Sequence, residues 1–122
     1  MKSKEQEQQI AYFDWLRCHE NKYPELRWIH AIPNGGKRNI AVAQKLKREG
    51  VKSGVWDVFA PISDGYHSGL YIEMKYGKNR LTENQKEFRE HIEKNRFVFR
   101  VCYSWIEAAQ ATVDYLRLPI EV

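Results

Sequence analysis

Three short stretches rich in β-branched and aromatic residues, at 55–60, 70–76 and 97–103, constrain the fold most strongly. Such residues favour β-strands. Pro61 ends the first stretch, and the turn-forming residues that follow it separate the first stretch from the second. We therefore expect the first two strands to pair as a hairpin around a turn at 61–69.

Helical patterns fill most of the remaining chain. Apolar residues recur at helical spacing over 5–19 and again from Ile40 to Leu46, where Gly50 is placed to cap a basic helix. Thr82 with Gln85 and Ser104 with Glu107 have the spacing of capping boxes, and they predict two further helices. An apolar stretch at 26–32 indicates a strand or extended segment. This order predicts one α/β domain over 1–122, with a mixed central sheet flanked by helices.

The composition indicates a globular protein, with 43% hydrophobic and 30% charged residues. No apolar run approaches the roughly 20 residues that span a bilayer, and the polar N-terminus does not resemble a signal peptide. Cys18 and Cys102 lack the CxxC spacing of a metal site, which favours free thiols in a reducing cytoplasm.

Ionisable residues in two neighbouring strands form the most informative pattern. Asp57 interrupts an apolar stretch. Glu73 and Lys75 are two residues apart in the next strand, so their side chains point to the same face. The expected hairpin brings Asp57 beside Glu73, where two carboxylates repel unless a cation lies between them. Oxygen ligands of this kind suit Mg²⁺ or Mn²⁺, and Lys75 could orient or help deprotonate an attacking water. The alternative is a solvated salt bridge between Glu73 and Lys75, but it leaves Asp57 as a costly charge among apolar neighbours.

These residues resemble the signature of the PD-(D/E)xK nucleases, and the whole chain resembles a stand-alone VRR-NUC domain. Such domains occur in bacteriophages and fused to DNA-repair nucleases. The likeness runs from about Glu5 to Leu116. The matching pieces are His30-x-Ile32-Pro33-Asn34-Gly35-Gly36-x-Arg38, Gly50-Val51-x-x-Gly54-x-x-Asp57, Tyr71-x-Glu73-x-Lys75 and Leu81-Thr82-x-x-Gln85. One departure is Trp56, where proline often precedes the aspartate; its side chain should face away from the metal.

The resemblance implies a restriction-endonuclease-like core that cleaves phosphodiester bonds with Mg²⁺ or Mn²⁺. The implied metal ligands are the carboxylates of Asp57 and Glu73 and the backbone carbonyl of Met74. A glutamate on the first helix often completes the metal shell in such folds, and Glu5 matches that position best, with Glu7 as the alternative. The implied catalytic residues are Asp57, Glu73, Lys75 and Gln85.

A basic segment between Lys37 and Lys52 contains one acidic residue, Glu49, and could bind a phosphate backbone. Before it, two glycines would allow backbone amides to approach a phosphate, which an adjacent arginine could grip in a bidentate way. The alternatives are a solvated helix face and an ordinary glycine turn. The resemblance also places His30 near the site, although a lone histidine is more often structural. The predicted DNA-binding residues are Asn34, Gly35, Gly36, Lys37, Arg38, Lys45 and Arg48.

Taken together, the patterns and the resemblance predict a metal-dependent DNA endonuclease. The favoured substrate is branched DNA, cut by a homodimer in the manner of a Holliday-junction resolvase. The predicted location is the cytoplasm. If the gene belongs to a phage, this is the cytoplasm of its bacterial host. One alternative is a flap or nonspecific nuclease that needs partner domains. The other is a DNA-binding module that keeps the nuclease fold without catalysis.

Overall fold

A mixed four-stranded sheet forms the centre of the computed structural model, which describes residues 3–33 and 39–122. The strands lie in the order β1 (His30–Ala31), β2 (Val58–Ala60), β3 (Gly69–Met74) and β4 (Phe97–Cys102). The pairs β1–β2 and β2–β3 are antiparallel, whereas β3–β4 is parallel. The sheet is therefore mixed, and the expected hairpin is formed by β2 and β3.

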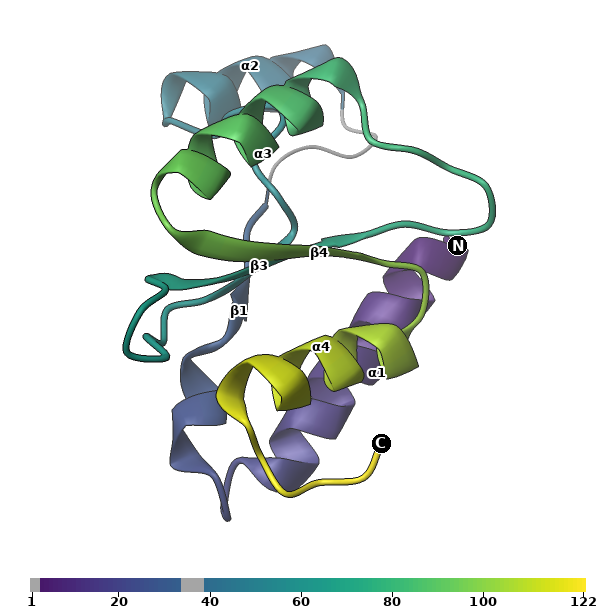
Figure 1. Ribbon diagram of the computed structural model, residues 1–122. Helices are drawn as coiled ribbons and strands as arrows, with labels where there is room; N and C mark the ends of the chain where they lie inside the picture. Colours follow the sequence, from purple (N-terminus) through teal and green to yellow (C-terminus); the bar gives the residue numbers. More distant parts are fainter. Residues whose placement is uncertain (1–2, 34–38) are drawn as a thin grey trace.

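Helices cover both faces of the sheet (Figure 1). One face carries α1 (Lys4–His19) and α4 (Trp105–Leu116), which also pack against each other. The other face carries α3 (Glu83–Lys94), with α2 (Ile40–Arg48) above it in the view. The architecture is the expected α/β arrangement of a mixed sheet between helices. Within the described residues, every helix is too short or too polar to cross a membrane.

Side-chain caps start α3 and α4 at the residues that the sequence indicates. Thr82 and Gln85 form the expected capping box of α3. In α4 the box is only half formed, because the Ser104 hydroxyl accepts from the Glu107 amide but the Glu107 carboxylate accepts from the Tyr103 amide instead of from Ser104. Gly50 follows α2 with a φ of 105°, and its amide donates to the Lys47 carbonyl, as expected for a helix cap.

Two of the expected extended segments are shorter than predicted. The first three residues of 26–32 lie in a 3₁₀ helix, η1 (Pro24–Trp28), because Pro24 favours a helical start. Only His30 and Ala31 pair with β2. The strand expected from residue 55 begins at Val58. Gly54 and Trp56 contact α3 instead of pairing with a neighbouring strand.

The main core lies between the sheet and the helix pair α1–α4. Alternate residues of β3 enter it, and Met74 is fully buried there. Its buried polar groups are paired, since the hydroxyls of Tyr12 and Thr112 are 2.7 Å apart and Thr112 donates to the Ala108 carbonyl. On the other face, aromatic rings of Phe59, Tyr71, Phe88 and Phe97 pack against one another beneath α3. Both faces are thus anchored, which fixes the end of β3 where the ionisable residues lie.

Candidate metal centre

Asp57 and Glu73 lie side by side, as the predicted hairpin requires. Val58 pairs with Ile72, so the next residues outward on the two strands are Asp57 and Glu73. The Asp57 amide donates to Glu73 Oε1 at 3.2 Å, and the Met74 amide donates to Asp57 Oδ2 at 2.9 Å. These reciprocal contacts hold both carboxylates at the end of the β2–β3 pair.

The segment before Asp57 is fixed by α3. Gly54 has a φ of 91°, and a Cβ there would lie 2.6 Å from the Asn84 carbonyl oxygen, so only glycine fits without a shift. The Asn84 side-chain amide donates to Ser53 Oγ at 3.0 Å. The Trp56 indole N–H donates to the Gln85 carbonyl at 3.0 Å, and its ring is fully buried. The Trp56 indole thus packs against α3 and helps position Asp57.

Gln85 joins α3 directly to the site. Its side-chain oxygen accepts from the Thr82 amide, and its side-chain nitrogen donates to Glu73 Oε2 at 2.9 Å. The capping box that starts α3 therefore also orients the amide that holds Glu73. The predicted position of Gln85 near the site agrees with this geometry.

Lys75 is the charge partner of Glu73. Its Nζ lies 3.6 Å from Glu73 Oε2, and both side chains are buried, with residue exposures of 8% and 1%. The Lys75 backbone amide donates to the Cys102 carbonyl, which ties the end of β3 to β4. This pair is buried, unlike the solvated salt bridge that was the alternative interpretation of the Glu-x-Lys pattern.

Glu5 brings a third carboxylate from the first turn of α1. Ligand oxygens of Glu5, Asp57 and Glu73 all lie within 4.8 Å of one another. Glu7, the alternative, is exposed and pairs with Lys4 at 3.5 Å. The geometry therefore favours Glu5 over Glu7 as the residue nearest the carboxylate pair.

The electrostatics of this cluster indicate that it needs a positive partner. Burial raises the pKa of Glu73, the neighbouring Asp57 charge raises it further, and Lys75 opposes the shift. Burial and Asp57 likewise raise the pKa of Glu5. A divalent cation would remove this repulsion, and an all-oxygen set of carboxylates is chemically suited to Mg²⁺ or Mn²⁺. The residues present thus fit the metal that the sequence predicts.

The predicted DNA-binding residues fall in two places. Asn34, Gly35, Gly36, Lys37 and Arg38 lie outside the described residues. Lys45 and Arg48 are exposed on α2, and Lys45 is paired only loosely with Glu49, at 4.0 Å. Their role in DNA binding stays a prediction.

His30 lies at the edge of the sheet. Its Nδ1 is 2.9 Å from the Trp28 carbonyl, and its ring meets Phe59 edge-on. Because a carbonyl can only accept, Nδ1 carries the hydrogen of this contact. His30 is outside the carboxylate cluster and has a structural contact on the aromatic face.

The connection that leaves β3 contains exposed residues that the sequence interpretation did not select. Tyr76, Lys78 and Arg80 follow Lys75 directly and are exposed. The Tyr103 hydroxyl donates to the Asn79 carbonyl and braces this connection. The sequence feature that indicates this exposed basic surface is the pair Lys78 and Arg80, which follows the strand that carries Glu73.

The chain belongs to the VRR-NUC domain family, whose model matches residues 3–105. A solved structure described as "VRR_NUC domain protein" is similar, with 29% identity and a TM-score of 0.77, over 97% of this chain and 92% of that chain. No curated protein matches the sequence. The family is one of nuclease domains, and the fold is the restriction-endonuclease-like α/β core that the sequence predicts.

Proposed function

We propose that this protein is a metal-dependent DNA endonuclease that hydrolyses phosphodiester bonds. The observation that carries the proposal is the cluster of Glu5, Asp57 and Glu73, with oxygens within 4.8 Å and with Lys75 3.6 Å from Glu73. A merely structural ion pair would not require a third carboxylate from a distant helix. Membership of a nuclease-domain family supports the same chemistry.

Each residue has a distinct role in this proposal. Asp57, Glu73, the Met74 carbonyl and Glu5 would hold Mg²⁺ or Mn²⁺, which supplies Lewis-acid activation of a water and charge neutralisation at the phosphate. Lys75 orients the attacking water and then stabilises negative charge on the phosphate. Gln85 positions Glu73 through its 2.9 Å hydrogen bond. Displacement proceeds in line, with water attacking phosphorus opposite the leaving oxygen.

The proposed substrate is branched DNA, cut by a homodimer. Two sites related by a two-fold axis match the pseudo-symmetry of a four-way junction. A chain of 122 residues is also too small to enclose such a junction alone. We place this activity in the cytoplasm, that of a bacterial host if the protein is phage-encoded. Sedimentation at micromolar concentration should show a dimer, and a monomer alone would contradict this part of the proposal.

Cleavage of labelled substrates tests the chemistry and the substrate separately. A four-way junction, a flap and the matching linear duplex are incubated with Mg²⁺, with Mn²⁺ or with EDTA. Lys75→Ala should retain metal and DNA binding yet cut about 100-fold more slowly or worse, in the range for loss of a group that stabilises charge in the transition state. Asp57→Ala should lose metal binding as well.

The outcomes separate the interpretations. Faster cutting of the junction, lost in EDTA and in Lys75→Ala, is the predicted result. Equal cutting of all substrates would keep the nuclease and remove the junction preference. Binding of every substrate without cutting would favour a non-catalytic DNA-binding module.

A further inference from the structure

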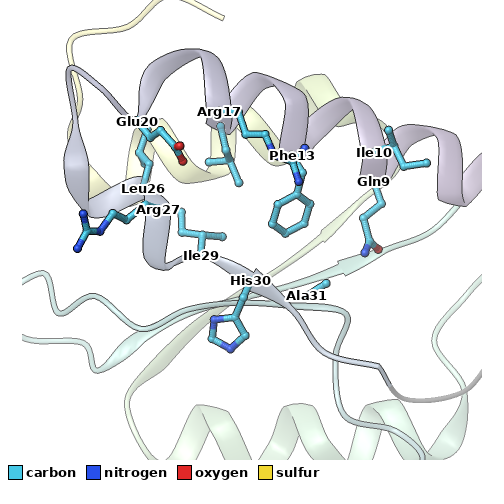
Figure 2. A pocket seen from close by; sticks show the side chains of 11 residues that line it. Gln9, Ile10, Phe13, Arg17, Glu20, Leu26, Arg27, Ile29, His30 and Ala31 are labelled. Atoms are coloured by element: carbon cyan, nitrogen blue, oxygen red, sulfur yellow. The ribbon is translucent and has the colours of Figure 1, made fainter.

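A groove of about 580 Å³ runs along α1, between this helix and the segment formed by η1 and β1 (Figure 2). Phe13 points from α1 into the space, and Ile29 lies on the opposite wall. Arg17 and Arg27 are among the polar residues at the rim. None of the roles proposed above uses this groove.

The groove begins next to the carboxylate cluster. Gln9 lines it and lies four residues after Glu5, so these two side chains share one face of α1. Phe13 and Arg17 continue the same face at further four-residue steps. With a rise of about 1.5 Å per residue, Phe13 lies about 12 Å along the helix from Glu5. Phe13 is therefore within reach of a nucleotide close to a phosphate held at the carboxylate cluster.

The lining suits an aromatic ring attached to an anionic backbone. Phe13, Ile29 and the 42%-exposed Ile10 supply apolar surface. Arg17 adds a cation to this lining. The Arg27 guanidinium lies 4.7 Å from the centre of the exposed Trp28 ring and extends away from Phe13 (Figure 2). Single-stranded nucleic acids are bound by such combinations of apolar or aromatic platforms and cations.

Other charges at the groove do not cancel this complementarity. Arg17 is paired with Asp14 at 3.3 Å, but both side chains are about two-thirds exposed, where such a pair is weak. Glu20 is the acidic residue of the lining, against the two arginines. The lining therefore carries more arginine than acidic side chains, which suits an anionic backbone.

We propose that the groove binds an unstacked base of the strand being cut, next to the scissile phosphate. A base that is stacked and paired in a duplex cannot enter the groove, because its faces and edge are already occupied. An unpaired nucleotide enters without that cost. This inference rests on the proposed nuclease function and adds to it a preference for DNA with an unpaired nucleotide beside the cut.

Three labelled substrates test the inference with Mn²⁺ present. They are a linear duplex, the same duplex with one unpaired nucleotide, and that bulged duplex with an abasic residue at the unpaired position. The wild type should cut the bulged duplex about tenfold faster than the linear one, within the range for loss of one base-stacking contact. The abasic bulge keeps the phosphate and loses the base, so it should be cut at close to the linear rate.

A matched pair of variants locates the effect. Ile10→Asp places a charge in the groove at an exposed position, which avoids the folding risk of changing Phe13. Ile106→Asp makes the same change at a 51%-exposed position on α4, outside the groove lining. Ile10→Asp should lose the bulge preference, whereas Ile106→Asp should keep the rates of the wild type.

Each outcome is decisive. Equal cutting of bulged and linear DNA by the wild type, or equal behaviour of the two variants, would overturn the inference. If nothing is cut, the proposed nuclease function fails, and the groove is tested by binding in EDTA. A short single strand containing 2-aminopurine should then bind the wild type and Ile106→Asp about tenfold more tightly than Ile10→Asp. Equal affinities would overturn the groove assignment.

Discussion

The β2–β3–α3 unit and helix α2 differ in how firmly the rest of the protein holds them. In the unit, Glu73 and Lys75 are buried, and Gln85 and the Met74 amide contact the carboxylates directly. In α2, none of the residues is buried, and Ile40 at its first turn is 75% exposed. The first region is fixed by packing on both sides, and the second presents most of its surface to solvent.

This difference matches the roles that we propose for the two regions. Hydrolysis requires carboxylates held in one geometry, so the supporting hydrogen bonds and burial are concentrated around Asp57 and Glu73. Phosphate binding by exposed lysines and arginines depends on charge more than on fixed geometry. The contrast predicts that changes in the first region alter stability and chemistry, and that changes in α2 alter mainly DNA affinity.

Glycine substitutions should show the largest contrast in stability. Gly54→Ala combines a φ of 91° with a Cβ 2.6 Å from the Asn84 carbonyl oxygen, whereas Gly50→Ala meets nothing within 4 Å. We expect Gly54→Ala to lower the free energy of unfolding by about 3 kcal/mol or more, and Gly50→Ala by about 1 kcal/mol, since only the first adds a clash to backbone strain. Urea unfolding measures both, and equal losses would contradict the close packing of Gly54 on α3.

The carboxylate cluster should make the metal-free protein less stable as pH rises. The stabilisation by added metal should instead increase with pH. Because the pKa of Glu73 is raised above its ordinary value of 4.5, the metal-free folded chain holds a proton that the unfolded chain releases. Stability in EDTA should therefore fall as pH rises from about 5 through the raised pKa. Added Mn²⁺ replaces the proton, and its stabilisation should grow with pH, reaching about 2.7 kcal/mol at 100 times Kd.

Thermal unfolding with and without Mn²⁺ measures both trends, and Glu73→Gln is the matched control. This variant has no proton to release at residue 73, so it should show a shallower pH slope in EDTA and a smaller gain with Mn²⁺. A variant with the wild-type slope and gain would show that Glu73 is not the group responsible.

Charge removal on α2 should have the smallest effect on stability. Lys45→Ala and Arg48→Ala should each change the free energy of unfolding by less than about 0.5 kcal/mol, since both residues are exposed. Each should also reduce the slope of log K against log salt for DNA binding by about 0.9. Lys94→Ala, an exposed change on α3 outside the basic segment, is the control. Unchanged slopes in the α2 variants would assign the DNA contact to another surface.

The sequence was sufficient for the carboxylate pair because its determinants are local. The turn at 61–69 and the alternation of β3 place Asp57 beside Glu73 without knowledge of the rest of the fold. The start of β2 was predicted too early. Gly54 and Trp56 contact α3 instead of pairing in the sheet, and residue types alone do not reveal these contacts. The approach of Glu5 depends on how α1 docks on the sheet, so only the family resemblance indicated it. Its role as a ligand stays a prediction.

The most direct test of the metal centre is a crystal grown or soaked with Mn²⁺ and measured for anomalous scattering. We expect one strong anomalous peak between Glu5, Asp57 and Glu73, at about 2.0 to 2.3 Å from their nearest carboxylate oxygens. The peak should be absent in Asp57→Ala. A structure with Mn²⁺ at other residues, or with Glu73 paired only to Lys75 and Gln85 at saturating Mn²⁺, would contradict this expectation.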